Sequence, residues 1–374
     1  MNREKYRRFL VVVFTVYVFF FIYYLSYTIY THASGESQTV ANIENKREIL
    51  NRIKTDDKRF MPLGMPVGIY IHSKGIMVLD TDEVTGMDGE KIEPTKNSLK
   101  SGDYITCFNG VEIDSIKGFT KLIQQNGEKQ CVLTVLRDGK ETTIEMTPIQ
   151  TESKAYKLGI WVRQDAQGIG TLTFVDENGH FVALGHGIAD VDTGEIIDIQ
   201  YGRLYESKIM SIIKGKNGEP GEMIGHIDYI HSPVLGIVES NNAKGIYGKL
   251  AKNVNLYDEE QAISIAQKHE VKEGEAWIRC RVDGEIKDYE IQIEHIEKLN
   301  LDGQKNFMIR VMDEELMKKT NGIVQGMSGS PIIQDGKLVG AVTHVLVNDP
   351  TRGYGIFIEN MLNEVKLTEQ KNAA

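Results

Sequence analysis

The pattern of hydrophobic and polar positions first sets apart an uncharged apolar run from Phe9 to Tyr30. The run is long enough to cross a bilayer as one helix, and it exceeds the apolar region of a cleaved signal peptide. Four basic residues precede it: Arg3, Lys5, Arg7 and Arg8. This flank predicts a cytoplasmic N-terminus, so we expect residues 1–30 to be a retained signal-anchor. The rest of the chain would then lie outside the cytoplasm.

A polar stretch and a small β-rich module follow the apolar run. Residues 31–59 carry few large apolar side chains and mix both charge signs, which is typical of an exposed linker. Residues 60–150 alternate short apolar runs with turn residues, a pattern that predicts strands. Strands are expected at 67–73 and 75–80, and an amphipathic helix at 116–125. A hairpin within 131–146 should turn at Asp138 and Gly139.

The stretch 151–366 has the pattern of a second, larger β-rich domain. Strand-like runs are separated by turn dipeptides: Asn178-Gly179, Asn217-Gly218, Asp283-Gly284 and Asp335-Gly336. Repeated hairpins over this length indicate one or two barrels or a sandwich. Helical periodicity is sparse, with candidate helices at 258–268, 313–320 and 359–365. Residues 367–374 form a polar tail.

Composition narrows the classes of partner. The formal net charge is -10, and beyond the extreme N-terminus we find no basic stripe with interleaved aromatic residues. Nucleic acid is therefore not expected as a partner. The three cysteines, Cys107, Cys131 and Cys280, lie far apart without the spacing of a zinc site, and we interpret them as buried thiols. We expect no metal and no cofactor.

The strongest chemical motif is Gly326-Met327-Ser328-Gly329-Ser330-Pro331. A serine between glycines on a tight turn has an exposed Oγ, while successive backbone N–H groups converge to form an oxyanion hole. Acyl transfer requires both features. The motif therefore predicts Ser328 as a nucleophile and Gly326, Met327 and Ser328 as the oxyanion-hole residues. The alternative reading is a glycine-rich turn without chemistry.

A nucleophilic serine requires a general base, and nine histidines are candidates. His186 ends an apolar strand, 181–184, and stands between two glycines, which hold the ring in place and leave room for a substrate. His344 lies inside the strand that follows the serine, so it is either a structural histidine or a substrate contact. We predict that His186 is the base. The acid that orients the imidazole remains open among three residues: Asp190, Asp192 and Asp313.

Two domain resemblances support this organisation. Residues 60–150 resemble a PDZ domain, on Gly102-Asp103, Ile105 and Asn109-Gly110 followed by Ile113. PDZ domains bind extended peptides by strand addition, but residues 60–69 do not match the family's usual carboxylate-binding loop. The serine motif and the hairpin after it resemble trypsin-like peptidases, which implies a double β-barrel. The same resemblance implies that the substrate contacts Thr343, His344 and Val345.

The chain as a whole resembles the SpoIVB peptidases, sporulation serine peptidases of endospore-forming bacteria. The resemblance rests on five segments: 168–174, 183–186, 322–333, 340–345 and 347–351. It also includes the membrane segment and a PDZ domain placed before the peptidase domain. Carried over, the family's catalytic residues fall on His186, Asp313 and Ser328. Only the resemblance selects Asp313 from the three acids.

The family resemblance further implies a biological role. The peptidase is exported from the forespore into the intermembrane space, cleaves its own N-terminal region, and cleaves a membrane complex that restrains an intramembrane protease. Release of that protease activates sigma-K. Two alternatives are an inactive PDZ scaffold and an envelope quality-control protease, whose PDZ domain normally follows the catalytic domain. Expression confined to sporulation would distinguish the family role from the second alternative.

Overall fold

The computed structural model describes residues 58–229, 231–297 and 303–364 of the chain. Among these residues, no helix is both long enough and apolar enough to span a bilayer. The predicted signal-anchor, nearly all of the predicted linker and the polar tail lie outside the described ranges.

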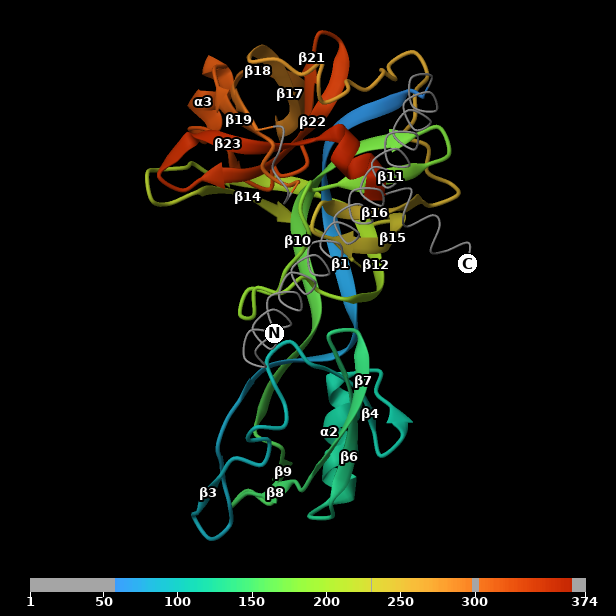
Figure 1. Ribbon diagram of the computed structural model, residues 1–374, viewed down its shortest axis with the longest axis vertical. Helices are drawn as coiled ribbons and strands as arrows, with labels where there is room; N and C mark the ends of the chain where they lie inside the picture. Colours follow the sequence, from blue (N-terminus) through green and yellow to red (C-terminus); the bar gives the residue numbers. More distant parts are fainter. Residues whose placement is uncertain (1–57, 230, 298–302, 365–374) are drawn as a thin grey trace, which may run out of the picture. The chain divides into compact units, whose positions relative to one another are not determined.

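Six strands close into a first barrel (Figure 1). Their order around the barrel is β1 (Phe60–Thr81), β10 (Ile160–Asp176), β11 (His180–Ala183), β16 (Gly245–Leu250), β15 (Val234–Asn242) and β12 (Ile199–Glu206), which returns to β1. Alternation along the chain places one set of side chains inside: Val67, Ile69 and Ile71 of β1 are fully buried, whereas Tyr70 and His72, which alternate with them, are partly exposed.

Six further strands form a closed second barrel. In order they are β17 (Gly274–Asp283), β18 (Glu285–Ile296), β19 (Phe307–Val311), β23 (Asp349–Phe357), β22 (Lys337–Leu346) and β21 (Pro331–Gln334). Fully buried β-branched and aromatic side chains fill it, among them Ile278, Ile291, Ile309 and Phe357. The fold is therefore mainly β with two six-stranded barrels, as the resemblance to trypsin-like peptidases implies.

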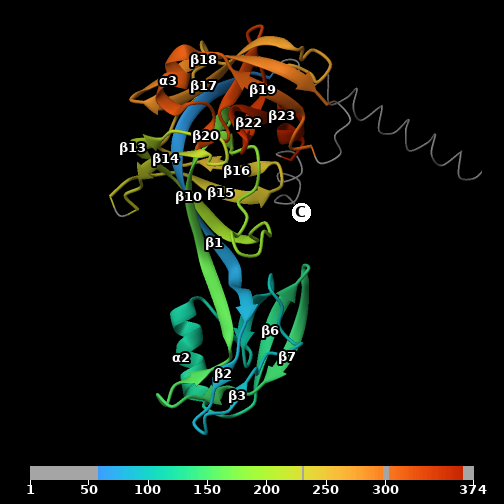
Figure 2. The ribbon, with the colours of Figure 1, turned by 90° about the vertical axis from the view of Figure 1, so that its left-hand side faces the viewer.

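Between β1 and β10 the chain folds into a smaller unit, here called the N-terminal module. It contains β4 (Tyr104–Phe108), β5 (Val111–Glu112), α2 (Ile116–Asn126), β6 (Cys131–Arg137) and β7 (Lys140–Met146). Two short strand pairs complete it: β2 (Val84–Thr85) with β3 (Lys91–Ile92), and β8 (Ile149–Gln150) with β9 (Tyr156–Lys157). In Figure 2, α2 and the β6–β7 hairpin lie on opposite sides of the module. Its core is separate from the two barrel cores.

The barrel and the N-terminal module share β1 and β10. The two strands pair from Phe60 with Asp176 to Thr81 with Ile160, so one ladder runs through both units. The sequence analysis expected separate strands at 67–73 and 75–80; instead they form one strand with a register shift between His72 and Met77. It also assigned residues 60–150 to the small module, whereas residues 60–73 pair inside the barrel. The module is thus inserted between β1 and β10 of the barrel, because each of these two strands continues across the bulge from the barrel into the module.

The turn dipeptides and two of the candidate helices occur where the sequence predicts them. Asp138 and Gly139 both have positive φ, 50° and 73°, as the tight hairpin turn between β6 and β7 requires. In α2, Ser115 caps the N-terminus, and Phe119 and Ile123 are buried on one face. The predicted helix at 313–320 appears as α3 (Glu314–Thr320). Residues 358–364 are helical at the end of the described chain.

The predicted helix at 258–268 is wrong. The segment is irregular, and its backbone bonds to strands instead: Ile263 and Phe60 exchange two hydrogen bonds of 2.9 Å, and Ala266 N–H donates to Leu338 O at 2.9 Å. The apolar residues that suggest helical periodicity, Ala262 and Ile265, are buried between the barrels' strands. Tertiary pairing has overridden the local preference.

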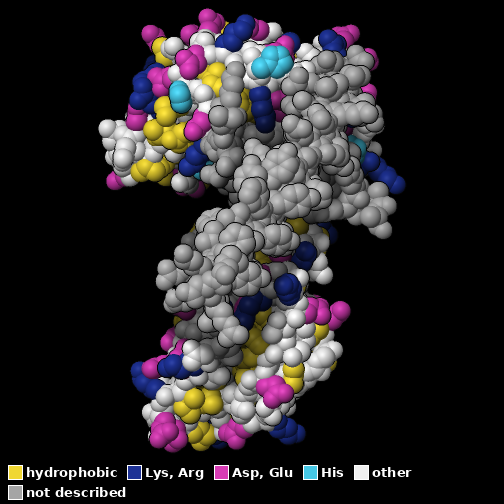
Figure 3. Space-filling model, viewed as in Figure 1, with side chains coloured by type: hydrophobic (Ala, Val, Ile, Leu, Met, Phe, Trp, Pro, Cys, Tyr) yellow, Lys and Arg dark blue, Asp and Glu magenta, His cyan; other side chains and the backbone are white. Residues whose placement is uncertain are grey.

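A short hairpin, β13 (Lys208–Ile213) and β14 (Gly221–His226), leaves the first barrel and pairs in parallel with β20 (Val324–Gln325). It thereby contacts the segment that precedes Ser328. On the described part of the face in Figure 3, acidic and basic side chains are interspersed rather than gathered into a basic band. Of the cysteines, Cys131 and Cys280 are buried as expected, whereas Cys107 is only partly buried.

Gly64 provides a test of how closely the two barrels pack. It has φ +63°, and a Cβ at this position would lie 2.3 Å from the Arg279 carbonyl oxygen of the second barrel. Gly139 has φ +73° with open space around it. We expect Gly64→Ala to reduce the free energy of unfolding by roughly 1–3 kcal/mol more than Gly139→Ala, measured by chemical denaturation, because only Gly64 combines strain with overpacking. Equal losses would show that the barrels do not pack this closely.

Candidate active site

Ser328 lies on a loop between β20 and β21 that packs against the first barrel. Gly329, the residue after it, has φ +93°, and a Cβ there would lie 2.2 Å from the Thr171 carbonyl oxygen and 2.5 Å from Leu184 N. Glycine is therefore required for the backbones to approach this closely. The motif predicted from sequence has a structural reason beyond the turn itself, because it joins the two barrels.

Backbone hydrogen bonds fix the serine loop on both sides. On the first barrel, Thr171 N–H donates to Ser328 O at 3.0 Å, and Thr171 Oγ1 donates to Gly326 O at 2.7 Å. On the second, Gly329 N–H donates to Val342 O at 2.8 Å. The nucleophile is thus held by the walls of both barrels rather than by a flexible loop.

His186 follows β11 after two residues with left-handed backbone, Leu184 and Gly185, each at φ 72°. At Gly185 a Cβ would lie 3.1 Å from Thr343 Cγ2 of β22, so the turn brings His186 against the second barrel. There its ring lies 5.1 Å from the ring of His344, centroid to centroid. The structure therefore brings His186 to the β22 segment that also receives the Ser328 side chain.

The His186 ring has a defined tautomer. Its Nδ1 lies 2.9 Å from the Gly187 carbonyl oxygen, which only accepts, so Nδ1 carries the proton and Nε2 is the free base. Burial lowers the pKa of His186, and the hydrogen bond to Gly187 opposes this only in part. The imidazole is therefore neutral at physiological pH, as a general base must be.

The Ser328 hydroxyl donates to the Thr343 carbonyl oxygen at 2.6 Å. In this arrangement its proton points at a backbone acceptor and not at His186. Among the described residues no hydrogen bond joins Ser328 to the His186 ring. The geometry is that of a resting site, and catalytic hydrogen bonds often form only when substrate is bound.

The predicted oxyanion-hole residues differ in whether their backbone N–H groups are available. Met327 N–H donates to Val324 O at 3.1 Å and is occupied, while Ser328 N–H has no acceptor within the described part of the chain. Gly326 adopts φ +98° and packs on Met223 of β14. Ser328 N–H is accordingly free to donate to a developing oxyanion, whereas Met327, which the sequence analysis included, is turned inward.

The predicted substrate residues lie on β22 with one edge open. Val345 and His344 pair with Gly353 and Tyr354 of β23 on one side. On the other side the ladder with β21 ends at Ala341, and Val342 bonds to the serine loop. Beyond it the Thr343 carbonyl oxygen accepts from Ser328, and no described strand pairs with His344 and Val345 on this side. His344 Nδ1 is buried and has no partner among the described residues. Burial, followed by the proximity of His186 and Lys305, lowers the pKa of His344 to about 4, so this ring is neutral as well.

Asp313 is placed away from the imidazole. Its carboxylate accepts from Leu316 N at 2.8 Å and caps α3. The other end of β19 begins at Phe307, three residues after Gln304. The Gln304 carbonyl oxygen accepts from the Thr343 hydroxyl at 3.3 Å, so this end of the strand lies near Thr343. Asp313 is six residues of extended chain beyond Phe307, which corresponds to roughly 20 Å along the strand. Within the described ranges no carboxylate bonds to the His186 ring, so the role that the family resemblance implies for Asp313 stays a prediction.

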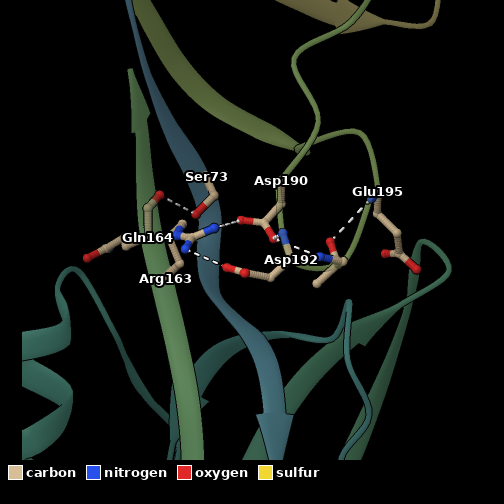
Figure 4. Close-up of polar contacts among 7 residues, drawn as sticks. Ser73, Arg163, Gln164, Asp190, Asp192 and Glu195 are labelled. Carbon is tan, nitrogen blue, oxygen red and sulfur yellow. Dashed lines mark hydrogen bonds and ion pairs between the residues drawn. The ribbon is translucent and has the colours of Figure 1, made fainter. Parts of the chain in front are cut away.

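The other two candidate acids, Asp190 and Asp192, bind an arginine instead. Arg163 of β10 contacts both carboxylates (Figure 4), Asp192 at 2.6 Å. Burial alone would raise the pKa of Asp190, but hydrogen bonds from the Thr193 and Asp192 amides and from Arg163 outweigh it and lower the pKa. Asp190 is therefore a buried anion paired with a cation, and it does not reach the imidazole.

Sequence reasoning missed two residues that hold the region after His186. Asn241 of β15 accepts from Ile188 N at 2.8 Å and donates to Ile188 O at 2.8 Å and Ile197 O at 2.9 Å. Arg163 is the second. Neither stands in a motif, because each acts on a segment far away in the sequence. Among the described residues no group of three or more metal-binding side chains is positioned to hold an ion.

Two six-stranded β-barrels, with Ser328 and the turn before His186 both against Thr343, are the arrangement expected of a serine endopeptidase. The model of the SpoIVB peptidase S55 family matches residues 154–362, more than half of the chain. The chain therefore belongs to this family, as the motifs indicated. No curated protein matches the chain.

Solved structures show distant similarity. The HtrA-type protease AlgW with a decapeptide is 11% identical over 56% of this chain and 55% of its own, at a TM-score of 0.33. The Rv3671c protease of M. tuberculosis in its active form is 13% identical over 54% of this chain and 74% of its own, at a TM-score of 0.30. A PDZ domain of an SdrC-like protein from Listeria monocytogenes is 18% identical over 24% of this chain and 87% of its own, at 0.19.

Removal of either predicted catalytic side chain should abolish turnover. We expect Ser328→Ala and His186→Ala each to lower kcat by a factor on the order of a million, since a nucleophile and its base act as a unit. The double variant should be no slower than either single variant. Initial rates on an unfolded protein substrate, with circular dichroism as the control for folding, provide the measurement. Normal turnover by Ser328→Ala would remove the serine mechanism.

Two substitutions at Asp313 separate capping from catalysis. Asparagine caps a helix about as well as aspartate, so Asp313→Asn should keep the stability, whereas Asp313→Ala should lose about 1 kcal/mol. Because the Asp313 carboxylate accepts from Leu316 N and bonds neither nitrogen of His186, we expect Asp313→Asn to keep most of kcat. A fall of orders of magnitude in a stable Asp313→Asn protein would instead establish Asp313 as the acid of the triad.

Proposed function

We propose that this endopeptidase acts during sporulation as a membrane-tethered enzyme that cleaves itself and a membrane-associated regulatory protein. The observation that carries the proposal is the arrangement of Ser328 beside the β22 edge, opposite a neutral His186. An extended peptide that pairs with residues 343–345 would pass this serine, and such pairing favours unfolded polypeptide segments as substrates. The family then supplies the biological setting, namely activation of pro-sigma-K processing.

In this proposal the N-terminal module is a PDZ domain that binds a peptide. A groove of ≈ 680 Å³ lies between α2 and the start of β10; Phe119, Ile123, Ile160 and Val162 are among its lining residues. Residues 160–163 of β10 pair with β1 on one edge, and the described chain provides no strand on the other. A free strand edge beside an apolar groove suits a ligand that adds as a further strand.

The location of the enzyme follows from the sequence of the N-terminus. With residues 9–30 as anchor and the basic flank in the cytoplasm, both the PDZ domain and the barrels would reach the forespore intermembrane space. Tethering restricts the enzyme to substrates near the membrane. Release from the anchor would let the enzyme diffuse away from its membrane.

Self-cleavage should occur between residues 31 and 60. A peptide bond must enter the active site in an extended conformation, so cleavage favours polar segments outside folded domains, and this one joins the predicted anchor to the first barrel strand. We expect mature protein to begin within residues 31–60, and the Ser328→Ala protein to retain the full N-terminus. N-terminal sequencing of both proteins from sporulating cells provides the measurement.

The same experiment separates the alternatives. Processing that persists in Ser328→Ala would show that another protease makes the cut. An intact Met1 in active enzyme would contradict self-cleavage altogether. If purified wild-type protein shows neither processing nor turnover of unfolded protein, the chain is an inactive PDZ scaffold.

A further inference from the structure

The segment that follows the catalytic base is attached to the N-terminal module as well as to the barrel. This histidine loop, residues 187–198, connects His186 to β12. At its far end Asp198 N–H donates to Tyr104 Oη at 3.0 Å, and Lys74 N–H donates to Asp198 O at 3.0 Å. Glu195 packs so closely on the module that a Cβ on Gly102 would lie 2.2 Å from its Oε2. The position of the loop therefore depends on the module.

Arg163 makes the strongest of these connections. Its guanidinium extends from β10 to Asp190 and Asp192 at the tip of the loop (Figure 4). The Asp190 side chain is 0% exposed, and its Oδ1 accepts from the Asp192 and Thr193 amides at 3.0 Å each. A buried carboxylate that loses its only cation is strongly destabilised where it lies. The loop can keep this conformation only while Arg163 remains bound.

Arg163 also adjoins the peptide groove. Ile160, Trp161 and Val162 line the groove, and Arg163 is the next residue on the same strand. On the other side of Arg163 lies Asp190, and His186 is four residues before Asp190 in the sequence. One arginine therefore stands between a candidate ligand site and the base of the active site. Asn241 joins the two ends of the loop, because it bonds both Ile188 and Ile197. Ile188 follows Gly187, the acceptor of His186 Nδ1–H.

We propose that Arg163 is a positioning residue that couples the groove of the N-terminal module to His186 through the histidine loop. A peptide added to the free edge of β10 would favour the backbone arrangement in which Arg163 reaches Asp190 and Asp192. A peptide bound in the groove would change kcat only if it binds this backbone arrangement more tightly than the alternative arrangements. The coupling to the groove rests on the proposed peptide-binding function, whereas the effect of Arg163 on His186 does not.

The first experiment measures kcat and KM on fluorescein-labelled casein, with the full-length chain as enzyme. We expect Arg163→Gln to lower kcat roughly 10- to 100-fold with little change in KM, because it displaces the base and leaves the substrate strand intact. Arg163→Lys should retain most of kcat. The control is Arg279→Gln, which breaks another two-contact arginine–aspartate pair, with Asp288, together with a bond to Pro62 O, away from the loop.

Arg163→Gln that keeps the wild-type kcat would overturn the proposal, as would equal losses in Arg163→Gln and Arg279→Gln. If Arg163→Gln does not fold, Asp192→Asn decides, because this carboxylate is 55% exposed and its loss leaves no buried charge. A lower kcat at unchanged KM supports the positioning role, and an unchanged kcat contradicts it. An inactive wild-type protein would instead show that the proposed peptidase function fails, so the two failures are distinct.

The second experiment tests the groove by a double-mutant cycle. Thr120 of α2 lines the groove and is exposed, so Thr120→Trp places an indole inside it; Lys121→Trp on the same helix is the control outside the groove. We expect Thr120→Trp to change kcat about fivefold or more in the wild type and not in Arg163→Gln. The same ratio in both backgrounds, or no change in the wild type, would overturn the coupling.

Discussion

The antiparallel pairing of β1 with β10 is the constraint on which the rest of the structure depends. Its register begins at Phe60 with Asp176 inside the first barrel and ends at Thr81 with Ile160 inside the N-terminal module. Ladder hydrogen bonds join the two strands on both sides of a bulge between His72 and Met77; beyond this bulge Met77 still faces the barrel core, whereas Ile76 and Val78 face the core of the module. The barrel therefore cannot close unless the module's two connecting strands are in register.

The active site depends on that closure, because its parts come from both barrels. Thr171 of β10 binds the backbone on either side of Ser328, and Gly329 fits against Leu184 only because it has no side chain. Leu184 in turn precedes the left-handed turn that carries His186 to β22. Nucleophile and base are thus placed by backbone contacts, and the Gly187 carbonyl fixes the imidazole tautomer that a carboxylate fixes in a Ser-His-Asp triad.

Sequence and structure agree where a function is local. Ser328 and His186 stand in short motifs whose glycines have identifiable conformational tasks, and the hairpin turns at Asp138-Gly139 and Asp335-Gly336 follow from residues that tolerate positive φ. Sequence and structure disagree where a residue interacts with a partner that is far away in the sequence. The carboxylates of Asp190 and Asp313 could each be an orienting acid by sequence, yet one is paired with an arginine 27 residues away and the other caps the helix after it. The irregular path of 258–268 likewise depends on strands of both barrels.

Insertion of the module within a barrel strand pair, rather than before the barrel, changes what the module can do. A domain joined by one linker can rotate without consequence for its neighbour, as relative domain motion is the default for small interfaces. This module is joined twice, by adjacent paired strands, and further by the Tyr104 and Arg163 contacts to the histidine loop. A shift of β10 at the groove must be absorbed within the ladder or passed to the loop. Because the loop begins at His186, the second outcome is the one by which the proposed peptide binding would change turnover.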